Sequence, residues 1–269
     1  MSDIVQTPSI AAPLESTSEV AGYVLEIFTS WQGEGIHHDA KQVFVRLSGC
    51  AQACRYCDTK ESWRRAPGFR AEARALSREW ERHDNPCRPG DVEAVVRRHV
   101  ESAGDYHSIS VTGGEPLDQP DFLLGLLPRL RRFGLPIFLE TAGTEPEALA
   151  KVLPLVDIVS ADIKLPSTPG VRTSWERIEA FLRTAKSPSI DLYTKIVVWD
   201  GAPEAELFQV RDLVAAVDPA IPVILQPVTP EAGMTPPAAE TLERWRGAFL
   251  QKLRRVEVIP QLHKQRGHL

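Results

Sequence analysis

The sequence has little cysteine, no long apolar run and no excess of positive charge. Four cysteines in 269 residues are too few for a disulfide-stabilised secreted domain. No apolar run approaches the roughly 20 residues that a membrane-spanning helix needs. The formal net charge of −5 argues against a general nucleic-acid binder and is easier to reconcile with a small-molecule substrate.

The first 20 residues differ in composition from the rest of the chain. Residues 1–20 are rich in Ser, Thr, Pro and Ala without any period, which predicts a disordered N-terminal segment. They lack the basic start and long apolar core of a secretory signal peptide, so we expect a cytoplasmic protein. Residues 21–269 have ordinary proportions of apolar and charged residues and are expected to form the core domain.

Short apolar runs rich in β-branched residues alternate with helical patterns along this core. The runs expected to form strands are Val43–Leu47, His107–Val111, Pro136–Leu139, Asp157–Val159, Leu192–Val198 and Val223–Leu225. The patterns expected to form helices are Asp91–Val100, Asp121–Arg132, Ser174–Arg183, Pro203–Val217 and Pro236–Leu253. Strand followed by helix, repeated six times, predicts an α/β fold with a parallel sheet and right-handed crossovers. Six repeats are fewer than the eight of a closed barrel, and the pattern alone leaves both a partial barrel and an open sheet possible.

The stretch Lys60–Gly90 interrupts this alternation. It is long and basic, and we expect an irregular insert with a short helix over Ala71–Arg82. Cys87, which lies in this stretch, is expected to be a free buried thiol. Tyr23–Phe28 and Val256–Ile259, at the two ends of the pattern, are expected to add flanking strands.

The strongest chemical signal is the sequence C-A-Q-A-C-R-Y-C, which places Cys50, Cys54 and Cys57 on one tight loop. Three thiolates at this spacing can hold three irons of a 4Fe–4S cluster and leave the fourth iron open for chemistry. A structural zinc site usually needs a fourth ligand, and the nearest candidates, His83 and Cys87, lie far along an irregular stretch. A Cys-x-x-Cys redox pair would leave Cys50 idle. The spacing therefore predicts an iron–sulfur cluster.

This cysteine spacing, with an aromatic residue before the last cysteine, resembles the radical S-adenosylmethionine (SAM) superfamily. The segment T-G-G-E-P at residues 112–116 is similar to the glycine-rich motif that holds the SAM amino group there, and two glycines let the backbone approach a ligand closely. The resemblance implies a partial β/α barrel of six parallel strands, with SAM bound to the open iron. The SAM contacts that it implies are Tyr56, Gly113, Gly114, Glu115, Glu140, Ser160 and Lys164.

Two of these SAM segments depart from the usual pattern. The segment E-T-A-G-T at residues 140–144 has Ala142 where asparagine is usual. The segment S-A-D-I-K at residues 160–164 also resembles the activating enzymes of glycyl-radical proteins. An activase of that kind is therefore an alternative function. A non-catalytic metal-binding or redox-sensing protein is the alternative from a different class.

The segment E-I-F-T-S-W-Q-G-E-G at residues 26–35 resembles the signature of the 7-carboxy-7-deazaguanine synthase family. Gln32 and Glu34 offer amide and carboxylate groups that match the donors and acceptors of a pterin edge. Arg46, four residues before the first cluster cysteine, has the bidentate fork that suits a carboxylate. Thr112 is a further candidate for substrate binding, and His263, in a segment that resembles the Q-x-H-K ending of the family, is another.

The resemblance implies a carbon–nitrogen lyase that converts 6-carboxy-5,6,7,8-tetrahydropterin to 7-carboxy-7-deazaguanine with loss of ammonia, on the route to queuosine and related 7-deazapurines of tRNA. It implies three cofactors: a 4Fe–4S cluster, SAM and Mg²⁺. The hydroxyl of Thr59 is the implied Mg²⁺ ligand, with Asp58 beside it, and Mg²⁺ does accept few protein ligands. A homodimer and an electron donor such as flavodoxin or ferredoxin are implied as well.

Overall fold

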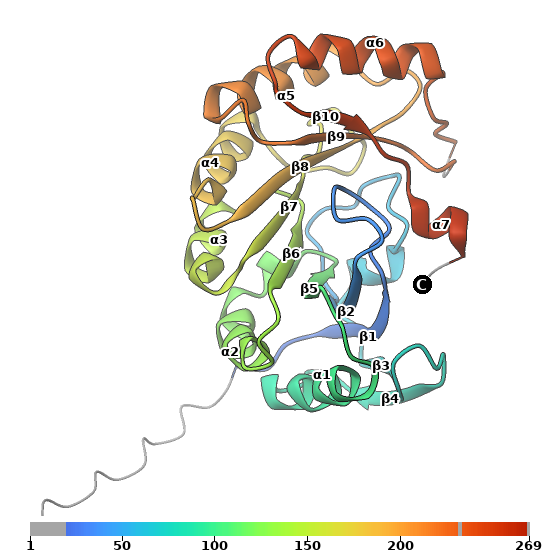
Figure 1. Ribbon diagram of the computed structural model, residues 1–269, viewed down its shortest axis with the longest axis vertical. Helices are drawn as coiled ribbons and strands as arrows, with labels where there is room; N and C mark the ends of the chain where they lie inside the picture. The colour runs from blue at the N-terminus through green and yellow to red at the C-terminus, as the bar shows by residue number, and fades with distance from the viewer. Residues whose placement is uncertain (1–19, 231–232, 268–269) are drawn as a thin grey trace, which may run out of the picture.

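A computed structural model describes residues 20–230 and 233–267 of the chain. Except for Val20, the segment 1–20 that was predicted to be disordered lies outside the described residues. Figure 1 shows one curved sheet with helices along its outer face. No helix in the described part of the chain is long and apolar enough to cross a bilayer.

The sheet contains ten strands in the order β10-β9-β8-β7-β6-β5-β2-β1-β3-β4. Their bounds are β1 (Val24–Trp31), β2 (Lys41–Leu47), β3 (Gly68–Glu72), β4 (Trp80–Asp84), β5 (Ser108–Gly113), β6 (Ile137–Thr141), β7 (Ile158–Asp162), β8 (Asp191–Val198), β9 (Val223–Pro227) and β10 (Val256–Val258). Neighbours from β2 through β5 to β10 pair in parallel, whereas β1 pairs antiparallel to β2. The predicted α/β fold with a largely parallel sheet is confirmed. The six predicted strands are β2 and β5–β9, and β10 extends the parallel run.

The helices that follow the parallel strands cover the outer face of the sheet (Figure 1). They are α1 (Pro89–Ala103), α2 (Pro120–Arg131), α3 (Pro146–Val152), α4 (Trp175–Ala185), α5 (Glu204–Val217) and α6 (Ala239–Leu250), with α7 (Leu262–Arg266) near the C-terminus and 3-10 turns η1 (Lys60–Trp63), η2 (Pro116–Asp118) and η3 (Leu153–Leu155). Helix and sheet residues such as Leu126, Leu139 and Phe181 are fully buried in one core. Burial of this apolar surface holds the helices against the outer face of the sheet.

The predicted helix over Ala71–Arg82 is wrong, because this segment contributes to a hairpin of β3 and β4 that pairs with β1 through β3. Along β3, Phe69 and Ala71 are buried in the core while Arg70 is exposed. This period of two is that of a strand with one buried face. The buried carboxylate of Glu72 closes the turn by accepting backbone N–H groups of residues 29, 76 and 78.

Cys87 is a free thiol in the apolar core, where its backbone pairs with Gly22. Burial raises the pKa of this thiol to about 12, so the neutral thiol is the stable form. Cys87 does not line the cavity described below. Its placement agrees with the expected free buried thiol.

Candidate functional site

The inner side of the sheet holds a cavity of about 1100 Å³. Ligands of open parallel sheets bind at the carboxyl ends of the strands, and this cavity lies over those ends. Fifteen of the sixteen residues singled out from the sequence line it: Gln32, Glu34, Arg46, Cys50, Cys54, Tyr56, Cys57, Thr59, Thr112, Gly113, Gly114, Glu140, Ser160, Lys164 and His263. Motifs more than 200 residues apart in the chain therefore share one cavity.

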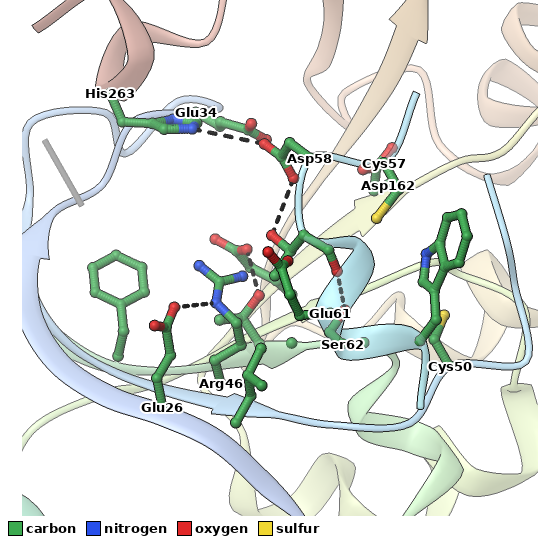
Figure 2. Close-up of a pocket in the computed structure, with 18 of the residues that line it drawn as sticks. Glu26, Glu34, Arg46, Cys50, Cys57, Asp58, Glu61, Ser62, Asp162 and His263 are labelled. Atoms are coloured by element: carbon green, nitrogen blue, oxygen red, sulfur yellow. Dashed lines mark hydrogen bonds and ion pairs between the residues drawn. The ribbon is translucent and has the colours of Figure 1, made fainter. Parts of the chain in front are cut away.

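The three cysteines lie on the loop that follows β2, and Figure 2 shows Cys50 and Cys57 at one end of the cavity. All three are free thiols, and Cys54 is buried. Burial, together with the nearby Glu115 carboxylate, raises the pKa of the Cys50 thiol to about 12. Thiols in such surroundings become ligands only when a metal stabilises the thiolate. Three of them facing one cavity form a donor set that fits three irons of a cubane cluster.

Backbone and side-chain contacts hold the cysteine loop in place. The N–H of Cys50 donates to the carbonyl of Trp63 at 3.3 Å, and the N–H of Cys57 to the carbonyl of Cys54 at 2.9 Å. The buried amide of Gln52 exchanges two hydrogen bonds with the backbone of Arg172, at 2.6 and 2.9 Å. The loop that must present three thiols is thus anchored at both its own turn and a neighbouring segment.

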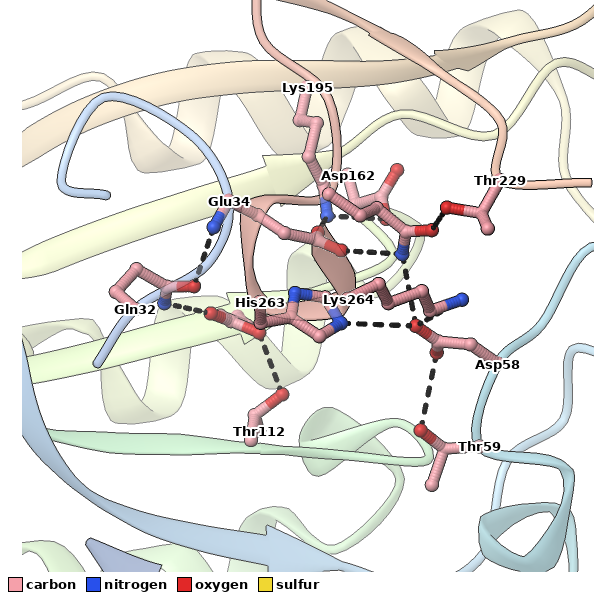
Figure 3. A network of polar contacts seen from close by, with 12 residues as sticks. Gln32, Glu34, Asp58, Thr59, Thr112, Asp162, Lys195, Thr229, His263 and Lys264 are labelled. Atoms are coloured by element: carbon pink, nitrogen blue, oxygen red, sulfur yellow. Dashed lines mark hydrogen bonds and ion pairs between the residues drawn. The ribbon is translucent and has the colours of Figure 1, made fainter. Parts of the chain in front are cut away.

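Glu140, at the end of β6, is held by two neighbours. The Gln32 side-chain amide donates to Glu140 at 2.5 Å, and the Thr112 hydroxyl donates to the other oxygen of Glu140 at 2.8 Å. The side-chain oxygen of Gln32 in turn accepts the backbone N–H of Glu34 at 3.1 Å. Figure 3 shows Gln32, Glu34 and Thr112 in this one network. Residues of the β1–β2 loop and of strand ends are thereby fixed relative to one another.

The buried ammonium group of Lys195 also lines the cavity. Lys195 on β8 is in ion-pair contact with Glu34 and lies 3.3 Å from Asp162. Burial raises the pKa of Glu34, but Lys195 and His263 together outweigh burial, so that the pKa ends below its usual value. Burial lowers the pKa of Lys195, yet the charges of Asp162 and Glu34 raise it well above its usual value. Both groups are therefore charged at neutral pH.

Lys164, two residues beyond the end of β7, extends this set of charges. Its ammonium lies 2.7 Å from Asp162 and 5.3 Å from the centre of the Tyr56 ring. The second oxygen of Asp162 is buried without a hydrogen-bond partner. A buried carboxylate oxygen without a hydrogen bond lowers the stability of the fold. This oxygen can therefore accept a hydrogen bond from a ligand in the cavity.

The C-terminal segment closes the cavity from the side of α7 (Figure 3). Gln261 donates to both Glu34, at 2.7 Å, and Asp58, at 2.9 Å. His263 packs against Gly33 so closely that a side-chain carbon at Gly33 would lie 2.4 Å from it, which explains the glycine between Gln32 and Glu34. The segment is therefore part of the cavity wall.

Comparison with known proteins agrees with this geometry. The profile of the radical SAM superfamily matches residues 44–214. The 7-carboxy-7-deazaguanine synthase of Geobacter sulfurreducens is 38% identical over 248 residues, which cover 91% of this chain and 96% of the relative. The chain belongs to the 7-carboxy-7-deazaguanine synthase family of radical SAM enzymes. The synthase of Thermococcus kodakarensis is 35% identical over 217 residues, covering 76% of this chain and 83% of the relative.

A solved structure shows the same fold. The crystal structure of QueE from Escherichia coli matches with a TM-score of 0.60 and 20% sequence identity, over 90% of this chain and 94% of that chain. The match to each of the two relatives named above spans most of both chains, and the superfamily profile, which matches residues 44–214, includes the cysteine loop. This chain is therefore a radical SAM enzyme of that family, for which a 4Fe–4S cluster and SAM are the cofactors.

One expected SAM contact of this synthase-family member lies behind the cavity wall. Glu115 does not line the cavity, because its buried carboxylate accepts the N–H groups of Leu117 and Ala142, at 3.0 and 2.7 Å, and the hydroxyl of Thr141 at 2.7 Å. Burial raises its pKa to about 7. Its side chain thus holds the neighbouring strand end and does not line the cavity. The backbone of Gly114 does line the cavity.

Steric crowding explains why the residue before Gly114 is also a glycine. Gly113 has a φ of +141°, and a side-chain carbon there would lie 2.3 Å from the backbone of Leu47. No other residue type fits this position without shifting β2. Strand β5 can therefore end beside the cysteine loop only through glycine.

Three carboxylate and imidazole side chains gather where the magnesium was expected. Glu34, Asp58 and His263 each offer a ligand atom, and these atoms lie within 4.8 Å of one another. The Thr59 hydroxyl donates to Asp58 at 3.2 Å and lines the same cavity. Burial raises the pKa of Asp58, but His263, Lys264 and Arg46 together bring it below its usual value. Oxygen donors of this kind suit Mg²⁺.

Lys195, Asp162 and Gln261 are site residues to which the sequence reasoning gave no binding role. Lys195 lies inside the apolar run of β8, with no motif around it. The alternation of a strand could have revealed it, because a lysine in the middle of a buried run needs a charged partner. Asp162 was part of a recognised segment but had no role of its own.

Proposed function

We propose that this enzyme converts 6-carboxy-5,6,7,8-tetrahydropterin to 7-carboxy-7-deazaguanine with loss of ammonia. The observation that carries the proposal is that the three-thiol loop and the Gln32–Glu34 loop face the same cavity. Relatives named 7-carboxy-7-deazaguanine synthase match over 91% and 76% of the chain. A cluster beside a planar-ligand pocket is what this reaction requires.

The cofactors would bind at the cluster end of the cavity. Cys50, Cys54 and Cys57 would hold the cluster, and the backbone at Gly114 would accept the SAM amino group. Bound there, the cluster and SAM would supply the radical chemistry that the reaction needs. Lys164, beside the ring of Tyr56, would meet the ribose or the carboxylate of SAM.

The protein's own groups would orient the pterin. The ionised Glu34 carboxylate accepts N–H groups of the pterin edge, and its orientation is fixed by Lys195 and Gln261. Arg46 would bind the substrate carboxylate through its guanidinium fork, and Figure 2 shows the two terminal nitrogens of Arg46 turned toward the cavity. His263 covers the ligand from the C-terminal segment. Closure by this segment would exclude water from the reacting centre.

Thr59→Ala should remove most of the stimulation of product formation by Mg²⁺, because one of the few protein contacts of the metal is lost. Thr59→Ser should keep the stimulation, since the ligand is the hydroxyl oxygen and not the methyl group. The measurement is a MgCl₂ titration of product formation with all three proteins. Iron content should be the same in each. An identical response of Thr59→Ala and the unaltered enzyme would return Thr59 to its contact with Asp58.

The proposed reaction is tested by incubating the reduced, SAM-loaded enzyme with the carboxy-tetrahydropterin under anaerobic conditions. We expect 7-carboxy-7-deazaguanine and ammonia in equal amounts, with Mg²⁺ required for full rate. SAM cleavage without any deazaguanine would support the activase alternative instead. One zinc per chain and no iron after reconstitution would support a non-catalytic metal-binding protein.

We propose that electrons come from a flavodoxin or a ferredoxin and that the enzyme is a homodimer. Sedimentation of the cluster-loaded enzyme tests the second point, and SAM cleavage with each purified carrier in place of a chemical reductant tests the first.

A further inference from the structure

A row of polar residues crosses the sheet from the cavity to the β3–β4 hairpin. Arg46 on β2 is the pairing partner of Thr112 on β5 and of Glu26 on β1. Glu26 pairs with Arg70 on β3, and Arg70 pairs with Arg82 on β4. Residues paired in this way project from the same face of a sheet. The hairpin therefore continues a row that begins with the expected carboxylate-binding arginine.

Glu26 is the centre of this row. Its side chain is 11% exposed and has an arginine on each side. Arg46 uses only its Nε on Glu26 Oε1, at 2.9 Å. Arg70 uses both Nε and Nη2 on Glu26 Oε2, at 2.9 and 2.7 Å. The two arginines thus divide the carboxylate between them, and each takes one oxygen.

This division leaves the reactive edge of Arg46 unoccupied by Glu26. A guanidinium can meet a carboxylate through Nε or through its two terminal nitrogens, and the second mode is a bidentate fork. Figure 2 shows Glu26 beside the Nε of Arg46, with the terminal nitrogens directed into the cavity. If Glu26 Oε2 were free, Arg46 could turn its fork onto both oxygens of Glu26 and away from a ligand.

We propose that Glu26 and Arg70 are positioning residues for Arg46. Arg70 holds Glu26 Oε2, so that Arg46 meets Glu26 through Nε alone and keeps its fork for the carboxylate of the substrate. The role of the hairpin is to supply Arg70 and to hold it in place. This inference rests on the proposed function for the identity of the carboxylate.

The hairpin contains what this role requires. The Arg70 guanidinium lies 4.4 Å from the centre of the Trp80 ring on β4, a cation–π contact that restrains a side chain otherwise 54% exposed. Arg82, the cross-strand neighbour of Arg70, repels it and favours its turn toward Glu26. Arg74 offers a matched control, because it lies in the same hairpin and pairs with Glu79 at 3.1 Å, with its side chain 72% exposed.

The experiment compares Arg70→Met and Arg74→Met in the cluster-loaded enzyme. Arg70→Met should raise KM for the carboxy-tetrahydropterin about tenfold, the effect of losing one charge-assisted hydrogen bond. Its kcat, its iron content and its SAM cleavage without substrate should stay as in the unaltered enzyme. Arg74→Met should change none of these. Equal KM values for the two variants would overturn the proposal.

A second arm tests whether Arg70 acts through Arg46. Arg46→Lys retains the charge but lacks the two terminal guanidinium nitrogens that Glu26 could bind in place of the substrate. Arg70→Met should therefore change KM little in that background. The same tenfold rise in both backgrounds would show that Arg70 acts on the substrate by another route and would overturn the proposal. A fall in kcat without a rise in KM would overturn it too.

A third arm does not depend on turnover. The ¹⁵N side-chain signals of Arg46, assigned by their loss in Arg46→Lys, report how its terminal nitrogens are bound. In Arg70→Met these nitrogens should become held by Glu26 and rotate more slowly, whereas Arg74→Met should leave them unchanged. Unchanged Arg46 signals in Arg70→Met would overturn the proposal. If the enzyme does not convert the pterin at all, the proposed function fails, and this arm still decides the inference.

Discussion

Replacing Cys50, Cys54 or Cys57 by alanine should abolish the iron–sulfur cluster, while Cys87→Ala should leave it intact. The first three thiols line one cavity on one loop, and Cys87 is buried in the core outside that cavity. Each of these substitutions would leave the cluster with two protein thiolates and two irons without a protein ligand, which is too few to hold it. Anaerobic reconstitution should give about four irons per chain in the unaltered enzyme and in Cys87→Ala.

Iron content and the charge-transfer absorbance of each reconstituted variant measure this prediction. Cys87→Ala removes one core thiol and serves as the matched control for handling and folding. Loss of the cluster in Cys87→Ala, or its retention in Cys54→Ala, would contradict the assignment of the ligands. SAM cleavage should follow the cluster, so it should be absent in the three cavity variants and present in the control.

Much of the site could be predicted because its residues fall in short motifs at the ends of strands. A parallel strand ends where the chain leaves the sheet, so the cysteine loop after β2 and the glycines after β5 meet over the same edge. The spacing of Cys50, Cys54 and Cys57 is a local property of one loop. Such features need no knowledge of distant contacts, and the sequence contains them directly.

The role of Glu115 could not be predicted from its motif. A carboxylate beside two glycines can face a ligand or turn inward, and the choice depends on which donors lie behind it. Here the Glu115 carboxylate accepts hydrogen bonds from the hydroxyl of Thr141 and the N–H of Ala142. These two residues lie 26 and 27 positions further along the chain. Their position follows from the packing of β6 beside β5, which no local pattern records.

The hairpin was mistaken for a helix for a related reason. Between Ala71 and Arg82 the apolar residues are few, and a short segment with little apolar content fits either period. The alternation of Phe69, Arg70 and Ala71 becomes meaningful only once β1 is known to lie beside them. The turn is then closed by Glu72, whose buried carboxylate collects three backbone N–H groups.

Lys195→Met should lower the free energy of unfolding by about 3–5 kcal/mol, because it leaves buried carboxylates without their shared cation. The Lys195 side chain is 8% exposed and contacts both Glu34 and Asp162. Methionine keeps the length of the apolar stem and removes the charge. Thermal or denaturant unfolding of the two proteins measures the difference. Activity should fall as well, since Glu34 would lose the contact that fixes its orientation.

The matched control is Lys252→Met, which removes an exposed lysine 2.9 Å from Asp212 with both side chains about half exposed. An exposed pair of this kind contributes less than about 1 kcal/mol. Equal melting of Lys195→Met and Lys252→Met would mean that Lys195 is not a buried link between the two carboxylates. Adding Glu34→Gln to Lys195→Met should restore part of the stability, because the unpaired charge is removed, but it should not restore activity.

The ionisation of Glu34 makes the effect of Lys195→Met depend on pH. In the unaltered enzyme burial raises the pKa of Glu34, but Lys195 and His263 together lower it by more, so the net shift is downward. The contribution of Glu34 to stability is then present above its unfolded-state pKa and is lost as the pH falls through its lower folded-state pKa. Without Lys195, burial and the nearby charge of Asp58 raise the pKa of Glu34, and only the charge of His263 still lowers it. The residual activity of Lys195→Met should therefore rise with pH across the range where the unaltered enzyme is insensitive to Glu34. A flat profile for the variant would show that Glu34 stays ionised without Lys195 and that Gln261 and His263 suffice to hold it.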